Sequence, residues 1–182
     1  ANAPENRPSS ADEVRQRLLR ILGGSHLKTQ QKQRAATDVK KTFSILDVLK
    51  EDKYGAVYLF EEQGSHKLFV VKKKPATSPG FDIAKRLSRV QHHNIAKVYG
   101  ASKNQRVFIQ VSEYCPSGAL SDRLLAPYRL NEFILIARQI VDALIAGHNA
   151  GIVHGNLRPS NILFDSNQAV KVCDFGLEEH YA

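Results

Sequence analysis

The chain has 182 residues, of which 42% are hydrophobic and 24% are charged, and its formal net charge is +8. This composition is that of a globular chain long enough to bury a core, and it excludes a low-complexity or fibrous protein. No apolar run reaches the roughly 18–20 residues that a membrane-spanning helix needs. The two cysteines, Cys115 and Cys173, provide neither a disulfide framework nor the spacing of metal ligands. We therefore expect a cytoplasmic protein without a membrane span.

The basic residues are spread along the chain and are not gathered in one run with aromatic residues between them. Dispersed positive charge is typical of a solvated surface, whereas segments that bind nucleic acid concentrate it. A nucleic-acid-binding module is therefore a minor alternative, which an affinity that falls steeply with salt concentration would support.

An N-terminal extension, residues 1–43, precedes the part of the chain that is rich in strand-forming residues. Ser10 and the acidic residues after it predict the start of a helix, and Gly23 predicts its end. Four apolar side chains fall on one face of this helix: Val14, Leu18, Leu19 and Leu22. The stripe has two interpretations, which are packing on the same domain and docking on a partner protein.

β-Branched and aromatic residues then recur in short runs with turn-forming residues between them. The expected strands cover residues 45–49, 55–60, 67–72, 96–101 and 107–114, and a short helix is expected over 82–90. Because only turn signals separate the first three strands, they are predicted to form an antiparallel meander.

Residues 130–149 have the periodicity of a long helix. Its expected buried face consists of Phe133, Ile134, Ala137, Ile140, Val141, Leu144 and Ile145. Short strands are expected at 152–153, 162–164 and 170–173, around a loop of polar residues. Strands with one helix among them, followed by a helical segment, predict an α+β fold with two lobes.

Several motifs then occur in a consistent order. The segment His154–Leu163 resembles the catalytic loop of protein kinases, H-R-D-L-K-P-x-N-I-L. Thirteen residues after Asn161, the triplet that begins at Asp174 resembles the D-F-G motif. Weaker matches are Val70–Lys72 to the third-strand V-A-I-K, residues 109–118 to the hinge between lobes, and residues 92–95 to H-P-N-I. On these five motifs together, the chain is identified as a member of the protein kinase superfamily.

The resemblance implies a protein-kinase-like α+β fold. Its N-lobe would be a five-stranded antiparallel sheet with one short helix, and its helical C-lobe would be incomplete. The implied division is an N-terminal extension over 1–43, an N-lobe over 44–114, and a hinge with a partial C-lobe over 115–182. Because only six residues follow Gly176, we interpret the chain as truncated after the D-F-G motif.

The resemblance also implies a site for ATP or ADP with Mg²⁺. Lys72 would hold the α- and β-phosphates, and Asn161 and Asp174 would bind the metal, which prefers hard oxygen ligands. The residues implied around the adenine base are Val57, Val70, Ser112, Glu113, Cys115 and Leu163. Judged by residue type alone, Asn161 could instead cap a turn, and Asp174 could instead form a structural ion pair.

The catalytic loop departs from the family pattern at two positions. Asn156 stands where the family has its proton-accepting aspartate, and an amide has no useful basicity near neutral pH. Gly155 replaces an arginine that, in many kinases, pairs with a phosphorylated activation loop. The resemblance therefore implies no catalytic base at position 156.

The implied phosphate-binding region departs as well. Lys50 and Asp52 occupy the first two glycine positions of the glycine-rich loop, where side chains hinder the approach of the backbone to phosphate. Only Gly55 of that loop remains. Ile83 stands where the family has the carboxylate that pairs with the lysine at position 72.

These departures favour a catalytically inactive pseudokinase domain that acts as a regulatory or scaffolding module and binds ATP or ADP weakly. It would act on a protein partner, such as an active kinase or an effector domain in the same polypeptide, or it would self-associate. The alternative is an active Ser/Thr-type protein kinase fragment with a non-standard catalytic loop, which Lys72, Asn161 and Asp174 favour.

Overall fold

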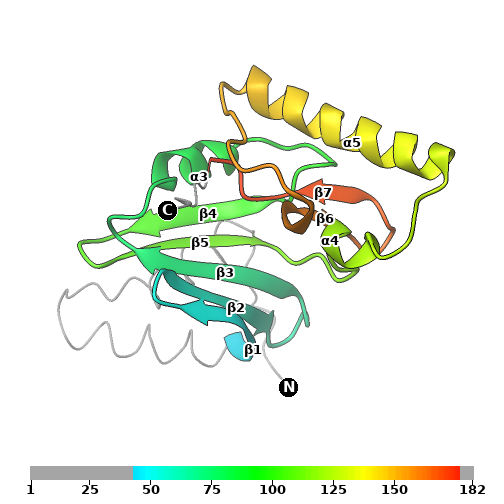
Figure 1. Cartoon of the computed structure of the whole chain (residues 1–182). Helices are drawn as coiled ribbons and strands as arrows, with labels where there is room; N and C mark the ends of the chain where they lie inside the picture. Colours follow the sequence, from blue (N-terminus) through cyan, green and yellow to red (C-terminus); the bar gives the residue numbers. More distant parts are fainter. Residues whose placement is uncertain (1–42, 177–182) are drawn as a thin grey trace. The chain divides into compact units, whose positions relative to one another are not determined.

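The computed structural model describes residues 43–176, so the helix expected before Gly23 lies outside the described residues. The elements in chain order are β1 (Phe43–Asp52), β2 (Gly55–Glu62), β3 (Leu68–Pro75), α3 (Phe81–Leu87), β4 (Val98–Lys103), β5 (Val107–Glu113), α4 (Leu120–Arg123), α5 (Leu130–Asn149), the 3₁₀ helix η2 (Pro159–Asn161), β6 (Ile162–Phe164) and β7 (Val170–Val172) (Figure 1). The predicted protein-kinase-like α+β fold is confirmed.

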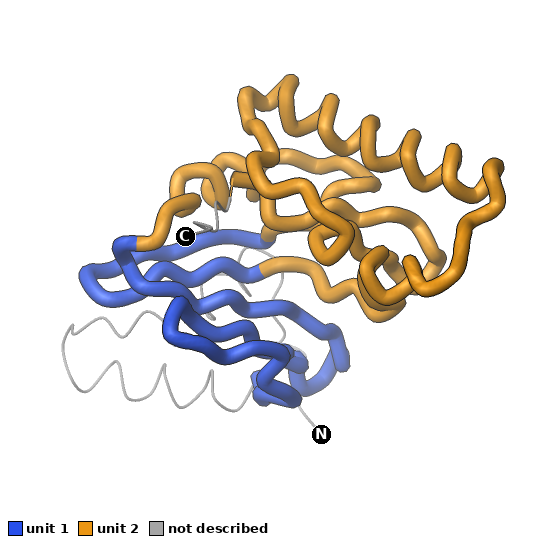
Figure 2. Tube along the Cα trace, in the orientation of Figure 1, with its two compact units in different colours: residues 1–77, 99–111 blue, residues 78–98, 112–182 orange. Residues whose placement is uncertain are grey.

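The described residues form two compact units, which Figure 2 distinguishes by colour. The first unit contains residues 43–77 and 99–111, and the second contains residues 78–98 and 112–176. The implied lobe boundaries after residues 43 and 114 stay a prediction.

A five-stranded sheet has the strand order β1-β2-β3-β5-β4. The predicted meander is present, because β1 pairs with β2 and β2 pairs with β3, both in antiparallel register. Side chains alternate between the two faces of a strand, and residues directly opposite each other on paired strands share a face. Val57 lies opposite Lys72, and Val70 lies two residues before Lys72. These three side chains therefore lie on one face of the sheet.

The other face of β3 carries the core of the first unit. Phe69 and Val71 are almost fully buried there. The remaining buried members of this cluster are Phe43, Phe60, Ile109 and Val111. The ring of Phe69 meets those of Phe43 and Tyr99 edge to face, at centroid distances of 6.2 and 5.3 Å. Packing from this face fixes β3, and with it the side on which Lys72 lies.

The second unit is built around α5 and the hairpin of β6 and β7 (Figure 1). Its buried core consists of Leu87, Ile95, Val98, Ala143, Ile152, Ile162, Phe164, Val170, Val172 and Phe175. At Gly147 of α5, a Cβ would lie 2.6 Å from the ring of Phe175, so only glycine allows this close approach.

The prediction of a strand at residues 152–153 was wrong. No strand is assigned there, and the backbone N–H of Ile152 donates to the carbonyl of Gly147 at 2.8 Å. That hydrogen bond closes the C-terminal end of α5, where carbonyl groups lack partners within the helix. Ile152 is buried all the same, whereas Val153 is 69% exposed.

The bounds of α5 are those predicted, but its buried face was predicted only in part. Ile140 and Leu144 pack against the core as expected. Four of the expected residues are instead half exposed: Phe133 (58%), Ile134 (51%), Val141 (51%) and Ile145 (50%). The fully buried positions are Ala143 and Gly147. Small residues bring the helix closest to the core, whereas the prediction was based on large apolar side chains.

Candidate functional site

His154 anchors the predicted catalytic loop, His154–Leu163, in the second unit. Its Nε2 lies 2.9 Å from the carbonyl oxygen of Cys173, and its Nδ1 accepts the backbone N–H of Asn156 at 3.2 Å. The ring packs on Phe175 at a centroid distance of 4.6 Å. These contacts suit the neutral ring with its proton on Nε2, and burial lowers the pKa of His154. His154 is therefore a packing residue, as its buried position indicates.

Asn156 is held through its main chain on both sides. Besides the N–H bond to His154, its carbonyl oxygen accepts Nδ2 of Asn161 at 2.9 Å. Asn161 is 3% exposed, and its own carbonyl oxygen accepts the backbone N–H of Cys173 at 2.9 Å. Gly155 has a φ of 73°, a left-handed conformation that glycine adopts without strain. The loop therefore has a fixed backbone that presents an amide side chain at position 156.

Asp174 also has a left-handed backbone, with a φ of 63°. This conformation costs a non-glycine residue about 1 kcal/mol, so the surrounding contacts must hold it. One such contact lies two residues on, where the N–H of Gly176 donates to the carbonyl oxygen of His154 at 2.6 Å. Backbone strain of this kind occurs at functional sites more often than elsewhere.

Asn161 and Asp174 offer oxygen donors that fit Mg²⁺. Because Nδ2 of Asn161 points at the carbonyl of Asn156, its amide oxygen is the end that remains for another contact. An amide oxygen and a carboxylate are ligands of the kind that Mg²⁺ accepts. Within the described residues, no group of three or more His, Cys, Asp and Glu side chains could hold a metal ion.

Ile83 of α3 lies beside Gly176. A Cβ built on Gly176 would collide with the side chain of Ile83, whereas the neighbouring acid, Asp82, is exposed. The side chain that α3 directs at the end of the D-F-G triplet is therefore apolar. The helix is fixed at its other end by Arg86, which donates to the carbonyl oxygens of Ala150 and Gly151. This arrangement satisfies carbonyl groups just beyond the C-terminus of α5.

The implied hinge residues Ser112 and Glu113 are the last two residues of β5, and Cys115 follows two residues after the strand ends. Ser112 and Cys115 are buried, and Leu163 of β6 is half-buried. Burial, together with the nearby Glu113 carboxylate, raises the pKa of the Cys115 thiol to about 12. The thiol is therefore protonated at neutral pH and acts as an apolar packing group.

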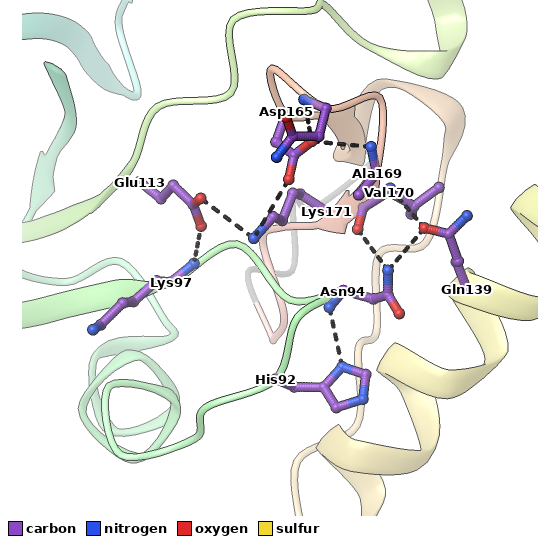
Figure 3. Close-up of polar contacts among 10 residues, drawn as sticks. His92, Asn94, Lys97, Glu113, Gln139, Asp165, Ala169, Val170 and Lys171 are labelled. Atoms are coloured by element: carbon purple, nitrogen blue, oxygen red, sulfur yellow. Dashed lines mark hydrogen bonds and ion pairs between the residues drawn. The ribbon is translucent and has the colours of Figure 1, made fainter.

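Sequence reasoning did not predict the contacts of two residues that organise this unit (Figure 3). Lys171 of β7 forms ion pairs with Glu113 and Asp165, at 3.3 and 4.0 Å. Asn94 is fully buried and donates from Nδ2 to Gln139 and to the carbonyl oxygen of Val170, both at 3.0 Å. The sequence did contain a signal for Lys171, which lies between two valines in a predicted strand. A charged side chain in a buried strand requires a partner of opposite charge, so an ion pair could have been predicted there.

In the first unit, the turn between β1 and β2 is closed by side chains. Nζ of Lys50 lies 3.0 Å from Oδ2 of Asp52, and Oδ1 of Asp52 accepts the N–H of Tyr54 at 2.8 Å. The hydrogen bond from Lys50 is the main cause that lowers the pKa of Asp52. Gly55 has a φ of 149°, and a Cβ there would collide with the carbonyl oxygen of Lys73. Val57, Val70 and Lys72 share one face of this unit's sheet, and the remaining implied site residues belong to the second unit.

The family model for the protein kinase domain matches residues 43–182. The chain belongs to the protein kinase family. It is 36% identical to Maternal embryonic leucine zipper kinase of Xenopus laevis over 57% of the chain and 16% of that protein. It is 30% identical to Calcium-dependent protein kinase 33 of Arabidopsis thaliana over 77% of the chain and 30% of that protein.

Among solved structures, the fold is similar to the crystal structure of Rad53 1-466 in complex with AMP-PNP. The TM-score is 0.66 at 27% sequence identity, over 83% of this chain and 43% of that one. The chain therefore spans less than half of that structure, and about a sixth to a third of the two kinases above. Among residues 43–176, no helix is long and apolar enough to cross a membrane.

Proposed function

We propose that this kinase-like domain binds an adenine nucleotide without transferring its phosphoryl group, and that it acts as a regulatory or scaffolding module. The observation that carries the proposal is the setting of Asn156. Hydrogen bonds hold its backbone on both sides, so the amide side chain stands on a fixed support at the position of the base. An amide cannot take a proton from a substrate hydroxyl group, and a general base contributes about 10²- to 10⁴-fold to the rate.

Two further contacts support the loss of transfer. Ile83 brings an apolar side chain to Gly176, so α3 supplies no carboxylate at that point. In the β1–β2 turn, Asp52 adds a negative charge where phosphate oxygens would approach, although Lys50 offsets part of it. Phosphoryl transfer depends on positioning and on charge stabilisation, and both are weakened by these residues.

Nucleotide binding is supported by a different set of residues. Val57 and Val70 share a sheet face with Lys72, which gives one apolar surface beside one cation. Asn161 and Asp174 supply the oxygen donors that suit Mg²⁺. The similarity to the Rad53 structure, which contains AMP-PNP, favours the same class of ligand here. When bound, Mg²⁺ would offset the negative charge of the phosphates.

A thermal-shift titration of the full chain with ATP, with and without Mg²⁺, tests the binding. We expect weak stabilisation that Lys72→Ala removes. Lys73→Ala is the matched control, because Lys73 is the next residue of β3 and its side chain lies on the other face. No stabilisation of the unmodified chain at millimolar ATP would contradict nucleotide binding.

Transfer of radiolabelled phosphate from ATP tests the inactivity in the same samples. We expect none to a general protein substrate or to the chain itself. Transfer that Asp174→Ala abolishes would instead support the alternative, an active Ser/Thr-type kinase that uses Asn156 only for positioning. The presence of Lys72, Asn161 and Asp174, with Asn161 held by two hydrogen bonds, is the observation in favour of that alternative.

We further propose that the module acts through a protein partner, such as an active kinase or an effector domain, or through self-association. The half-exposed apolar residues of α5, among them Phe133, Ile134 and Val141, support an interaction of this kind. Light scattering of the purified chain separates self-association from the binding of a different protein.

A further inference from the structure

Lys171 lies in the middle of β7, between two buried valines. Its side chain is only 13% exposed, and a buried ammonium group is costly unless opposite charges and hydrogen bonds compensate it. Two carboxylates do so from different segments. Glu113, at the end of β5, lies 3.3 Å from Nζ, and Asp165, just after β6, lies 4.0 Å from it (Figure 3). Lys171 therefore links the start of the hinge to the β6–β7 hairpin.

Glu113 is held at several atoms. Its Oε2 accepts the backbone N–H of Lys97 at 3.0 Å, and its own N–H donates to the carbonyl oxygen of Lys97 at 2.8 Å. Its other carboxylate oxygen, Oε1, is the one that faces Lys171. A side chain engaged at both oxygens has little rotamer freedom, so the backbone at Glu113 is fixed with it.

Asp165 is fixed from the other side. Its Oδ1 accepts the backbone N–H groups of Asn167 and Ala169, at 2.9 and 3.0 Å. Its Oδ2 is the oxygen that faces Lys171. The ion pair is therefore anchored in the turn of the hairpin, and it does not depend on a mobile side chain.

A second attachment lies further along the hinge. Ser117 donates its N–H to the carbonyl oxygen of Phe164 at 3.1 Å, and Phe164 donates its N–H to the carbonyl oxygen of Gly118 at 3.0 Å. The segment 113–118 is thus fixed at both ends to one hairpin. Asn161 precedes that hairpin and Asp174 follows it by two residues, and neither takes part in the ion pairs of Lys171 or in the hydrogen bonds to Phe164.

We propose that Lys171 is a positioning residue for the base-binding side of the nucleotide site. It acts through Glu113, and it holds the backbone of residues 113–115 at the position where an adenine ring binds. This inference rests on the nucleotide binding proposed above. In this proposal Lys171 acts on the hinge through Glu113, so its effect should concern the base and not the phosphates.

The test compares ligands with and without a base, by calorimetric titration of the full chain. Adenosine contains the base alone, and inorganic tripolyphosphate with Mg²⁺ contains the phosphates alone. We expect Lys171→Met, which keeps the length of the stem, to weaken adenosine binding about tenfold, which corresponds to about 1.4 kcal/mol. The affinity for tripolyphosphate should change by less than about twofold, because Lys171 is not among the residues proposed to bind the phosphates or Mg²⁺.

Four further variants, one of them a double variant, give the test its controls. Glu113→Gln keeps the shape of the side chain and should show the same base-specific loss, which serves if Lys171→Met fails to fold. In the double variant the losses should not add, because the two residues act as one unit. Lys171→Arg should restore adenosine affinity through its retained charge. Lys85→Met, the same change at an exposed lysine of α3, should have no effect on either ligand.

The outcomes separate the two proposals. If the unmodified chain binds neither adenosine nor ATP, the proposed nucleotide binding is wrong, and the role of Lys171 is wrong with it. If the unmodified chain binds adenosine and the variants bind it equally well, only the positioning role is overturned. Equal losses for adenosine and tripolyphosphate, together with a lower melting temperature, would mean that Lys171 is merely structural.

Discussion

The β1–β2 turn and the catalytic loop both lack residues of the kinase pattern, but they differ in what holds their backbones. In the catalytic loop, the main chain around Asn156 is fixed by His154 and Asn161, two residues that match the pattern. In the β1–β2 turn, Asp52 closes the backbone itself, together with Lys50. The first region has exchanged one functional group on a preserved support. The second carries Lys50 and Asp52 at the positions matched to glycines of the pattern, and these two side chains close the turn.

This difference bears on the two halves of the proposed function. A preserved support would need only one new side chain to regain a base, whereas a turn closed by its own side chains offers less open backbone to a phosphate group. The predictions below concern first the stability of the second unit, then proton binding in the catalytic loop, and last ligand affinity at the β1–β2 turn.

The largest effect is expected at buried Asn94, in comparison with Asn104 in the turn between β4 and β5. Asn94 is fully buried, and Asn94→Ala removes its hydrogen bonds to Gln139 and to Val170. The substitution should lower the free energy of unfolding by about 2–3 kcal/mol. Asn104 accepts two backbone N–H groups at a partly exposed turn, so Asn104→Ala should cost about 1 kcal/mol.

Urea denaturation followed by circular dichroism measures both values. Because Gln139 also accepts the N–H of Val170 at 3.0 Å, it remains in place when Asn94 is shortened, with one acceptor site unfilled. Equal losses at Asn94 and Asn104 would contradict the view that buried hydrogen bonds hold the second unit together.

The strands and helices of this chain could be predicted better than the contacts that fix the site. Periodicity predicted the bounds of α5 and of β6, because local residue patterns determine where helices and strands form. It predicted the buried face of α5 only in part, since the helix is apolar over much of its surface and small residues decide the closest approach. It also did not predict the ion pairs of Lys171, because their partners lie 58 and 6 residues away along the chain.

A smaller effect is expected on the pH dependence of stability, through His154. Burial lowers its pKa in the folded state below the ordinary value of 6.5, so the unfolded chain binds the proton more tightly. Stability should therefore fall as the pH drops below 6.5, and this loss should level off below the folded-state pKa. Protonation would place a second N–H at Nδ1, facing the N–H of Asn156.

Denaturation midpoints between pH 7.5 and 5 test this, with His154→Gln as the variant that keeps a hydrogen-bonding side chain. The variant should be less stable at pH 7.5 but should lose less stability on acidification. His92, whose pKa burial also lowers, contributes a slope of the same sign, so part of the dependence should remain.

The smallest effect is expected from Asp52→Gly in the β1–β2 turn. The substitution removes the ion pair with Lys50 and the hydrogen bond to Tyr54, and it restores a glycine at a position where the kinase pattern has one. Removing the negative charge should strengthen binding of ATP by about two- to fivefold, the range expected for one exposed charge interaction. Adenosine affinity should not change, because the base is bound elsewhere. Asp47→Gly, an exposed acid of the same strand, is the matched control. If Asp52→Gly leaves ATP affinity unchanged while Lys72→Ala abolishes it, the closed turn does not limit phosphate binding. The β1–β2 turn and the catalytic loop would then differ in backbone structure, but that difference would not affect the affinity for ATP.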